Sequence, residues 1–179
     1  MSALPQRKPV AEEAKGKSDK ELMKTFDARR SAELVIALAG PIGCGIAGVA
    51  DALEARLKDR GYLDVVRIKL SVFLESALAD QLVSVPEPDA KKSDRYNRYM
   101  KLQDAGKQLR QKTGNSAILA EFAARQISTD RLKRGGDVND QGDGPIVPSR
   151  IAYIIDQVKR PEEVTLLRAL YRNVFYLAG

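Results

Sequence analysis

The stretch VIALAGPIGCGIAG, residues 35–48, constrains the fold of this chain more than any other. A short, continuously apolar run that ends in glycine is typical of a β-strand buried on both faces. After Gly45 the apolar residues recur at the spacing of one helix face, with charged residues on the opposite face. Gly61 stands where this helix is expected to end. The sequence therefore predicts a strand, a glycine-rich turn and a helix in immediate succession.

The rest of the chain extends this unit into an α/β pattern. The apolar stripe of the first helix consists of Ile46, Val49, Ala50, Leu53 and Leu57. A second strand at about Val65–Leu70 completes a strand–helix–strand unit, for which a right-handed crossover is expected. The further expected elements are a short helix to about Leu82, a helix from the N-cap Ser93 to Gly114, a helix from about Ser116 to Ile127, a strand RIAYIID, a helix RPEEVTLLRALY that opens with Pro161, and a strand NVFYLAG.

Two further expectations concern packing and loops. The helix after Ser93 is expected to bury one stripe, made of Tyr96, Tyr99, Leu102, Ala105 and Leu109. The segment KRGGDVNDQGDGPIVPS, residues 133–149, is rich in glycine and has no periodicity, so a mobile surface loop is expected there.

The composition is that of a protein with a single core. A chain of 179 residues with 44% hydrophobic residues is long enough for one domain. No apolar run approaches the roughly 18 residues that span a bilayer, and the N-terminus lacks the apolar centre of a signal peptide. With one cysteine, Cys44, no internal disulfide can form, so we expect a reducing cytoplasm.

The net charge of +6 indicates affinity for anions, but the basic residues are dispersed. Residues 1–30 are polar and lack periodicity, so we expect a disordered leader there and a folded domain over residues 31–179. Aromatic residues are few and do not alternate with the basic ones, which favours a solvated leader over a nucleic-acid arm. The basic residues of the leader are Arg7, Lys8, Lys15, Lys17, Lys20, Lys24, Arg29 and Arg30.

The chain contains no histidine, and this absence excludes several kinds of site. A Ser-His-Asp triad, an imidazole zinc site and a histidine acid or base are all impossible, and a single cysteine cannot form a thiolate zinc cluster. Chemistry is left to carboxylates, lysine and arginine, hydroxyls and backbone amides. We assign no catalytic residue and no metal site from the sequence.

The glycine-rich turn resembles a P-loop, G-x-x-x-x-G-K-[ST], in which backbone N–H groups hold phosphate. Gly40 and Gly45 have the required spacing, but Ile46 and Ala47 replace the lysine and the hydroxyl residue. Backbone amides and a helix N-terminus need no side chain, so we expect weak phosphate binding and poor phosphoryl transfer. A tight strand-to-helix turn without a ligand is the alternative. The candidate nucleotide-binding residues are Gly40, Pro41, Ile42, Gly43, Cys44, Gly45, Ile46 and Ala47.

Other residues are candidates to complete such a site. Lys69, Arg110, Arg125 or Lys159 would have to supply the missing cation. Asp156 follows four apolar residues of the expected strand RIAYIID and is a candidate contact for magnesium or nucleotide; a cap of the following turn is the alternative. Cys44 is either a small filler or a reactive thiol at a helix start. Three further carboxylates are interpreted as surface residues: Asp64, Glu75 and Asp104. The predicted fold is α/β and P-loop NTPase-like, with a short parallel sheet of about four strands flanked by helices.

With the motifs GPIGCGIAG, IKLS, LQDAGKQLR and RIAYIIDQVKRPEEVTLLRALYRNVFYLAG placed, the chain resembles the N-terminal, kinase-like P-loop domain of the bacterial anti-phage deoxycytidine-nucleotide deaminases. The resemblance covers roughly Ser31–Gly179 and is most specific over Arg150–Gly179, which is similar also to nucleotide and dephospho-coenzyme A kinases. Family members are hydrolases that deaminate dCTP or dCMP and deplete deoxynucleotides during phage infection.

The resemblance implies that catalysis and nucleotide binding belong to different domains. In the family, zinc belongs to a C-terminal deaminase domain with H-x-E and P-C-x-x-C motifs, and these motifs are absent from this chain. What carries over is a regulatory nucleotide-binding half, with a nucleoside triphosphate and magnesium as candidate ligands. A deaminase domain and further copies of the chain are its candidate partners. Because the last expected strand ends at Gly179, we expect a chain cut at a domain boundary. The alternatives are a nucleoside or nucleotide kinase with a divergent loop and an interaction module without ligand.

Overall fold

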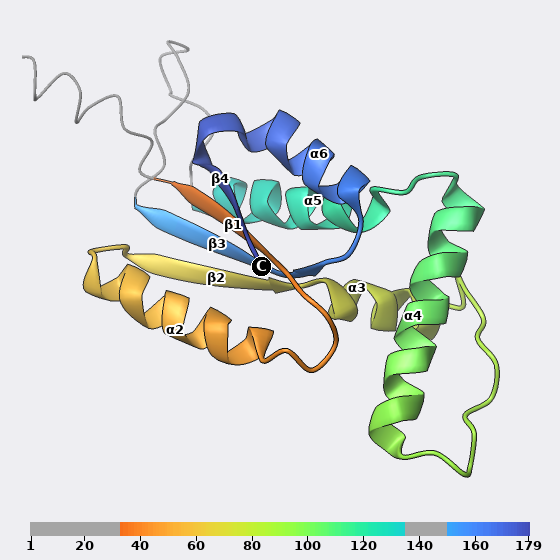
Figure 1. Ribbon diagram of the computed structural model, residues 1–179. Coiled ribbons are helices and arrows are strands. Elements are labelled where there is room, and N and C mark those ends of the chain that lie inside the picture. Colours follow the sequence, from red (N-terminus) through yellow and green to blue (C-terminus); the bar gives the residue numbers. More distant parts are fainter. Residues whose placement is uncertain (1–32, 135–149) are drawn as a thin grey trace, which may run out of the picture. The chain divides into compact units, whose positions relative to one another are not determined.

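Four parallel strands in the order β2-β3-β1-β4 form the sheet at the centre of the structure (Figure 1). The computed structural model describes residues 33–134 and 150–179. The expected leader over residues 1–30 and nearly all of the expected loop over residues 133–149 lie outside these ranges. The elements follow one another as β1 (Leu34–Ala39), α2 (Ile46–Asp59), β2 (Asp64–Lys69), α3 (Leu70–Ala79), α4 (Asp94–Thr113), α5 (Ile118–Lys133), β3 (Ile151–Val158), α6 (Pro161–Tyr171), a 3-10 turn (Arg172–Val174) and β4 (Phe175–Ala178).

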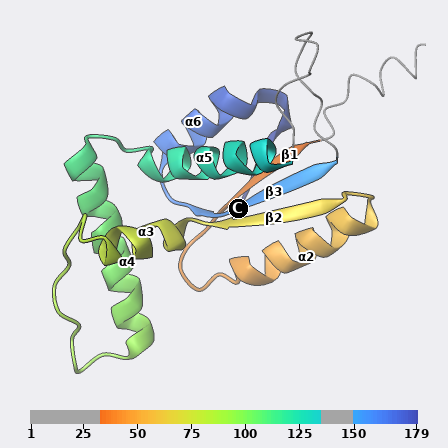
Figure 2. The same ribbon diagram turned by 180° about the vertical axis from the view of Figure 1, so that it is seen from behind.

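Helices cover both faces of this sheet, so the expected α/β class with a parallel sheet of four strands is confirmed. Helix α2 lies along one face, and α5 and α6 lie along the other, as opposite views of the molecule show (Figures 1 and 2). Strand β1 serves both layers by alternation: Val35 and Ala37 join the larger core, whereas Ile36 and Leu38 join the core beneath α2. This is why the strand is apolar without interruption.

Local signals place several helix ends as expected. The Ser93 hydroxyl accepts the N–H of Tyr96 at 3.3 Å and caps α4. Helix α2 ends at Asp59, and Gly61, which follows the C-cap residue Arg60, has a φ of 82° that is readily available to glycine. The N–H groups of Gly61 and Tyr62 donate to Lys58 and Leu57 carbonyls, at 3.0 and 3.1 Å. Helix α5 continues to Lys133, beyond the expected end at Ile127.

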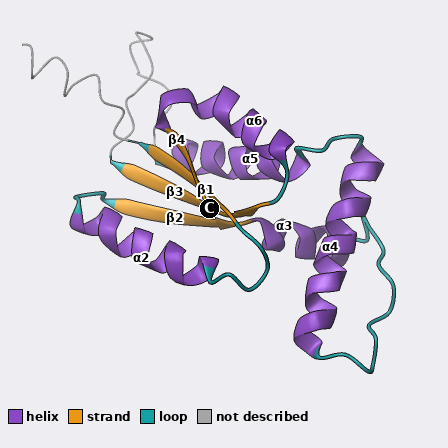
Figure 3. Cartoon of the chain, in the orientation of Figure 1, coloured by secondary structure: helices purple, strands orange, loops and turns teal. Residues whose placement is uncertain are grey.

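Two residues expected in the core are exposed. Val49 is 48% exposed, because α2 meets the sheet through a narrower stripe that contains Ile46, Ala50 and Leu57. Tyr96 is 46% exposed, because the residues that α4 buries, Ala105, Gly106 and Leu109, all lie in its second half. Figure 3 shows α3 and α4 beyond the end of the sheet where the strands finish. The first turns of α4 contact the segment before the helix, since the side-chain amide of Asn97 donates to the Asp89 carbonyl at 2.9 Å.

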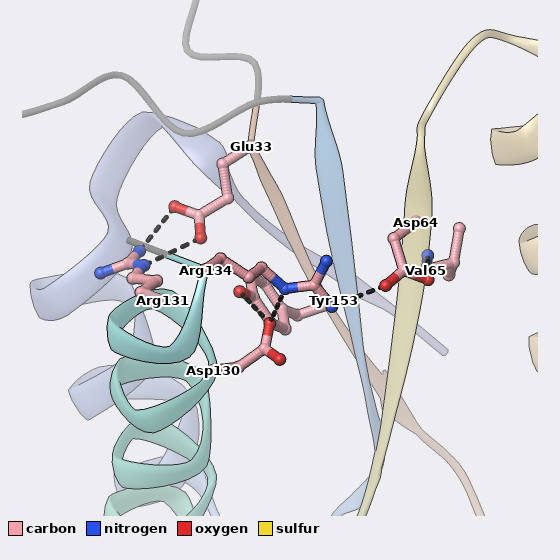
Figure 4. Close-up of polar contacts among 7 residues, drawn as sticks. All are labelled: Glu33, Asp64, Val65, Asp130, Arg131, Arg134 and Tyr153. Atoms are coloured by element: carbon pink, nitrogen blue, oxygen red, sulfur yellow. Dashed lines mark hydrogen bonds and ion pairs between the residues drawn. The ribbon is translucent and has the colours of Figure 1, made fainter. Parts of the chain in front are cut away.

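Charged side chains at the amino-terminal end of the sheet form a closely paired network (Figure 4). Arg131 of α5 donates to both carboxylate oxygens of Glu33, at 2.9 and 2.5 Å. Asp130 accepts the Tyr153 hydroxyl at 2.9 Å and Arg134 Nε at 2.7 Å. Arg134 also reaches Asp64 at 2.6 Å, at the start of β2. The end of α5 is thereby tied to the starts of β1 and β2 and to β3.

No helix within the two described ranges has both the length and the apolar composition needed to cross a membrane.

Candidate functional site

The connections of the sheet create a crevice at the carboxyl ends of β1 and β3. These strands are neighbours, yet β1 continues into α2 on one face and β3 continues into α6 on the other. In open parallel sheets, ligands bind where neighbouring connections diverge in this way. A pocket of about 650 Å³ lies there. Its lining includes Gly40, Pro41 and Ile42 from the loop after β1, Ala47 from the start of α2, Lys69, Asp156, Gln157 and Lys159 from strand ends, and Tyr99, Gln103, Gly106 and Arg110 from α4.

The loop after β1 and the start of α2 form one border of this pocket. Gly43 and Gly45 have φ values of 87° and 80°, in the left-handed region that glycine adopts without strain. Helix α2 begins at Ile46 with no side-chain cap and no acidic residue in its first turn. Within the described ranges, the N–H groups of Ile46 and Ala47 have no hydrogen-bond acceptor. The pocket wall therefore carries the partial positive charge of a helix N-terminus.

The side chains of this loop close over Gly40. A Cβ atom on Gly40 would lie 2.7 Å from Cys44 Sγ and 3.0 Å from Ile46 Cδ1, so a larger residue there would require these two side chains to move. Ile46 occupies the position of the P-loop lysine, and its side chain is buried against Ile36 and Leu38 of the core. The residue at position 46, which is the cationic lysine in a P-loop, is therefore a core residue in this protein. Cys44 itself is exposed.

Strand β3 has an irregularity where it meets the pocket. Ala37 pairs with Ile155 but Ala39 pairs with Val158, so two residues of β3 lie opposite one residue of β1. The extra residue is a bulge over Asp156 and Gln157, and Gln157 has a φ of 68°. Asp156 was expected at the end of this strand, but the strand continues to Val158 because the bulge absorbs the extra residue.

Asp156 lies near charged residues that are distant from it in the sequence. Its Oδ2 atom is 3.9 Å from Nη2 of Arg67, whose other terminal nitrogen pairs with Asp51 of α2. Its Oδ1 atom is buried and has no hydrogen-bond partner among the described residues. Arg67 was not predicted as a site residue, although its place inside the otherwise apolar strand segment VVRI is an available signal.

Arg110 and Lys159 reach the pocket from two different elements. Nη2 of Arg110 donates to Glu163 at 2.7 Å, and Nζ of Lys159 donates to the Gly40 carbonyl at 3.4 Å. A Cβ atom on Gly106 would lie 3.1 Å from Nη1 of Arg110, so this glycine in mid-helix leaves room for the guanidinium group. Glu163 is fully buried and was missed by sequence reasoning, because nothing local indicates a partner 53 residues away.

Not all of the residues expected to complete the phosphate site lie at the pocket. Lys69, Arg110, Asp156 and Lys159 all line the pocket, whereas Arg125 is exposed on α5 and is not among its lining residues. The carboxylates interpreted as surface residues also lie elsewhere: Asp64 pairs with Arg134, and Glu75 pairs with Arg98 at 2.6 Å. No three acidic or cysteine side chains within the described ranges come together as a metal site.

Unpartnered polar atoms gather at this end of the sheet. Among the residues that the structure describes, three buried side-chain atoms have no hydrogen-bond partner: Arg67 Nε, Arg110 Nε and Asp156 Oδ1. Arg110 and Asp156 line the pocket, and Arg67 adjoins Asp156. Because buried polar groups in folded proteins are nearly always paired, such a cluster is typical of a site that a ligand or water completes.

The chain matches no protein-family model, and a search of curated proteins finds no significant match. The resemblance to the deaminase family therefore stays a prediction from the motifs.

Proposed function

We propose that residues 31–179 form a nucleotide-binding domain of the P-loop NTPase type, whose pocket holds the phosphate groups of a nucleoside triphosphate. One observation carries the proposal: among the described residues, the uncapped start of α2 and four cations line a pocket whose lining contains a single carboxylate, Asp156. The four cations are Lys69, Arg98, Arg110 and Lys159. This charge balance favours a polyanion. The volume of about 650 Å³ is in the range of small-molecule sites.

The lining residues that α4 contributes are suited to the nucleoside part of the ligand. Tyr99 offers an aromatic surface, Leu102 an apolar one, and Gln103 an amide that can pair with the edge of a base. A magnesium ion in this pocket would be held by Asp156, by water and by the ligand's own phosphates, since Ala47 provides no hydroxyl group.

The proposed role of this domain is regulatory. Ile46 and Ala47 leave the loop without the lysine and the magnesium ligand that phosphoryl transfer uses. The motif resemblance supports the nucleotide-sensing half of a cytoplasmic anti-phage deaminase acting on deoxycytidine nucleotides. In that arrangement, nucleotide bound here would control a zinc deaminase domain that depletes deoxynucleotides. The reading frame downstream of the Gly179 codon tests this part: H-x-E and P-C-x-x-C motifs support it, and their absence refutes the deaminase assignment.

The binding proposal is tested with Ala47→Glu, compared with Ala55→Glu on the same helix. Both alanines are exposed, but only Ala47 lines the pocket. A carboxylate at the start of α2 interacts favourably with the helix dipole, so the fold is retained. We expect tripolyphosphate and dCTP to bind Ala47→Glu about 10-fold more weakly or worse, a difference of about 1.4 kcal/mol. Ala55→Glu should bind like the original protein.

Titration calorimetry measures both affinities. Equal binding to the two variants would refute a phosphate site at this loop. If neither tripolyphosphate nor any nucleoside triphosphate binds the original protein, the interaction module without ligand becomes the better description.

A kinase with a divergent loop is a second candidate, favoured by the cations that reach the pocket from outside the loop. Lys159 follows β3 and places Nζ 3.4 Å from the Gly40 carbonyl oxygen, and Arg110 belongs to α4. Transfer of phosphate from ATP to a deoxynucleoside monophosphate would establish the kinase. Nucleotide binding without turnover would establish the regulatory domain.

A further inference from the structure

The loop after β1 lacks a cation of its own, and its geometry shows why the motif position cannot provide one. Ile46 is 7% exposed and packs with Leu38 and Ala50 beneath the sheet. A side chain in this orientation faces the core rather than the pocket. Any ammonium group that helps the loop hold phosphate must come from another element.

Lys159 meets this requirement. It follows β3, lines the same pocket as Gly40 and Ala47, and places Nζ 3.4 Å from the Gly40 carbonyl oxygen. Taking the proposed function as given, we propose that Lys159 is the phosphate-binding cation of this P-loop, delivered from the β3–α6 turn. It replaces the lysine that the motif places at residue 46.

A buried carboxylate fixes the backbone that carries this lysine. Glu163 Oε2 accepts the N–H groups of Lys159 and Arg160, at 2.8 and 3.1 Å. Its Oε1 atom accepts Nη2 of Arg110 from α4. Capping of α6 explains the contact with the Arg160 amide. The contacts with Lys159 and Arg110 go beyond capping, because they bring the backbone of one pocket cation and the side chain of another to a single carboxylate. Glu163 is therefore a positioning residue for both.

The arrangement also indicates the class of ligand. Lys159 lies at the loop, and Arg110 presents a guanidinium group from α4, so two cations on separate elements face one pocket. A chain of phosphates can contact both groups, whereas a single phosphate has fewer oxygens to share between them. The site is thus built for a nucleoside triphosphate in preference to the monophosphate, and the preference depends on Lys159.

The test compares Lys159→Met and Lys159→Arg with the matched control Lys58→Met. Lys58 lies in the last turn of α2, far from the loop along the helix, and pairs with Glu54 at 2.6 Å, so its replacement removes the same charge outside the pocket. Calorimetric titrations use tripolyphosphate, dCTP, dCMP and deoxycytidine with the full chain. Thermal unfolding of each variant verifies that it is folded.

For Lys159→Met we expect dCTP and tripolyphosphate to bind about 10-fold more weakly or worse, as for the loss of a charge-assisted hydrogen bond. Binding of deoxycytidine should not change, and that of dCMP should change less than that of dCTP. Lys159→Arg should retain most of the affinity, and Lys58→Met all of it. Glu163→Gln should shift triphosphate affinity in the same direction as Lys159→Met, with Lys159 still present.

The outcomes separate this inference from the proposed function. If the original protein binds triphosphates and Lys159→Met binds them equally well, the inference is overturned and the phosphate site at the loop stands. If the original protein binds none of the phosphate probes, the proposed function fails first. An equal loss for all four ligands would also overturn the inference, because it would indicate a general structural effect.

Discussion

The two ends of the sheet differ in how completely their charged side chains are paired. At the amino-terminal end, Arg131, Asp130 and Arg134 of α5 are paired with Glu33, Tyr153 and Asp64 (Figure 4). At the carboxyl end, Arg67, Arg110 and Asp156 each keep a buried polar atom without a partner within the described residues. Both ends contain charges that burial makes costly, but only one end pairs them completely.

The two ends therefore allow the residues that stabilise the fold to be distinguished from those that are available to bind a ligand. Completely paired charges hold elements together, so their removal should lower stability and leave ligand binding intact. Incompletely paired charges around a pocket contribute less to the fold and are available to a ligand.

The largest loss of stability is expected for Arg131→Met at the amino-terminal end. The substitution removes two charge-assisted hydrogen bonds to Glu33, whose side chain is 5% exposed, and the contact of the guanidinium group with the Tyr171 ring. We expect the free energy of unfolding to fall by about 3 kcal/mol. Urea denaturation measures the loss, and titration with tripolyphosphate should give an unchanged affinity. A loss below about 1 kcal/mol would contradict the structural role of this end.

The next effect appears at alkaline pH. Burial raises the pKa of Tyr171 to about 12, above its usual value of 10.0. Because the folded pKa is raised, the contribution of this group to stability is complete below pH 10 and is lost as the pH rises toward 12. At pH 11 the original protein should lose about 1 kcal/mol that Tyr171→Phe does not lose.

Thermal unfolding at pH 8 and pH 11 checks this for both proteins. Burial raises the pKa of Tyr153 in the same direction, so part of the alkaline loss should remain in Tyr171→Phe. Identical pH profiles of the two proteins would contradict a raised pKa of the Tyr171 hydroxyl.

Gln157→Gly tests the bulge at the carboxyl end. The left-handed φ of 68° is strained for glutamine and not for glycine, so the free energy of unfolding should rise by about 0.5 kcal/mol. The matched change Gln126→Gly, on the exposed side of α5, should lower it by about 1 kcal/mol. Urea denaturation of both variants measures whether each change raises or lowers the free energy of unfolding. A loss in both variants would mean that the Gln157 side chain stabilises the fold.

The smallest effect on stability is expected for Asp156→Asn. Oδ1 has no partner to lose, and Arg67 keeps its ion pair with Asp51, so the free energy of unfolding should change by less than about 0.5 kcal/mol. Any increase of dCTP affinity on adding magnesium chloride should disappear in this variant. A destabilisation as large as that of Arg131→Met would remove the distinction between the two ends.

Much of the fold could be predicted because it is encoded locally. The run before Gly40 is apolar on both faces, and so indicates a strand between two helical layers. Ser93, Gly61 and Pro161 mark helix ends through contacts within a few residues. The loop residues, Lys69, Asp156 and Lys159 lie at strand ends, and parallel strands bring their carboxyl ends to one edge. This rule does not place Arg110 of α4, and Arg125, named with it as a candidate, lies outside the pocket.

The parts that were missed involve partners far apart in the chain. Glu163 lies 53 residues from Arg110, and Glu33 lies 98 residues from Arg131. The exposure of Val49 and Tyr96 depends on which neighbours are present, which a helical stripe does not reveal. The bulge at Gln157 depends on how β3 pairs with β1.

By itself the sequence determined the order of strands and helices, the glycine-dependent turn after β1 and the absence of a lysine at residue 46. These are properties of neighbouring residues, whose backbone preferences and apolar spacing are fixed along the chain. Only the tertiary structure decided the strand order, the burial of Ile46, the position of Lys159 beside Gly40 and the carboxylate that fixes it. The reason is physical: such contacts form only when segments distant in the sequence pack together, and packing depends on the shape of the whole domain.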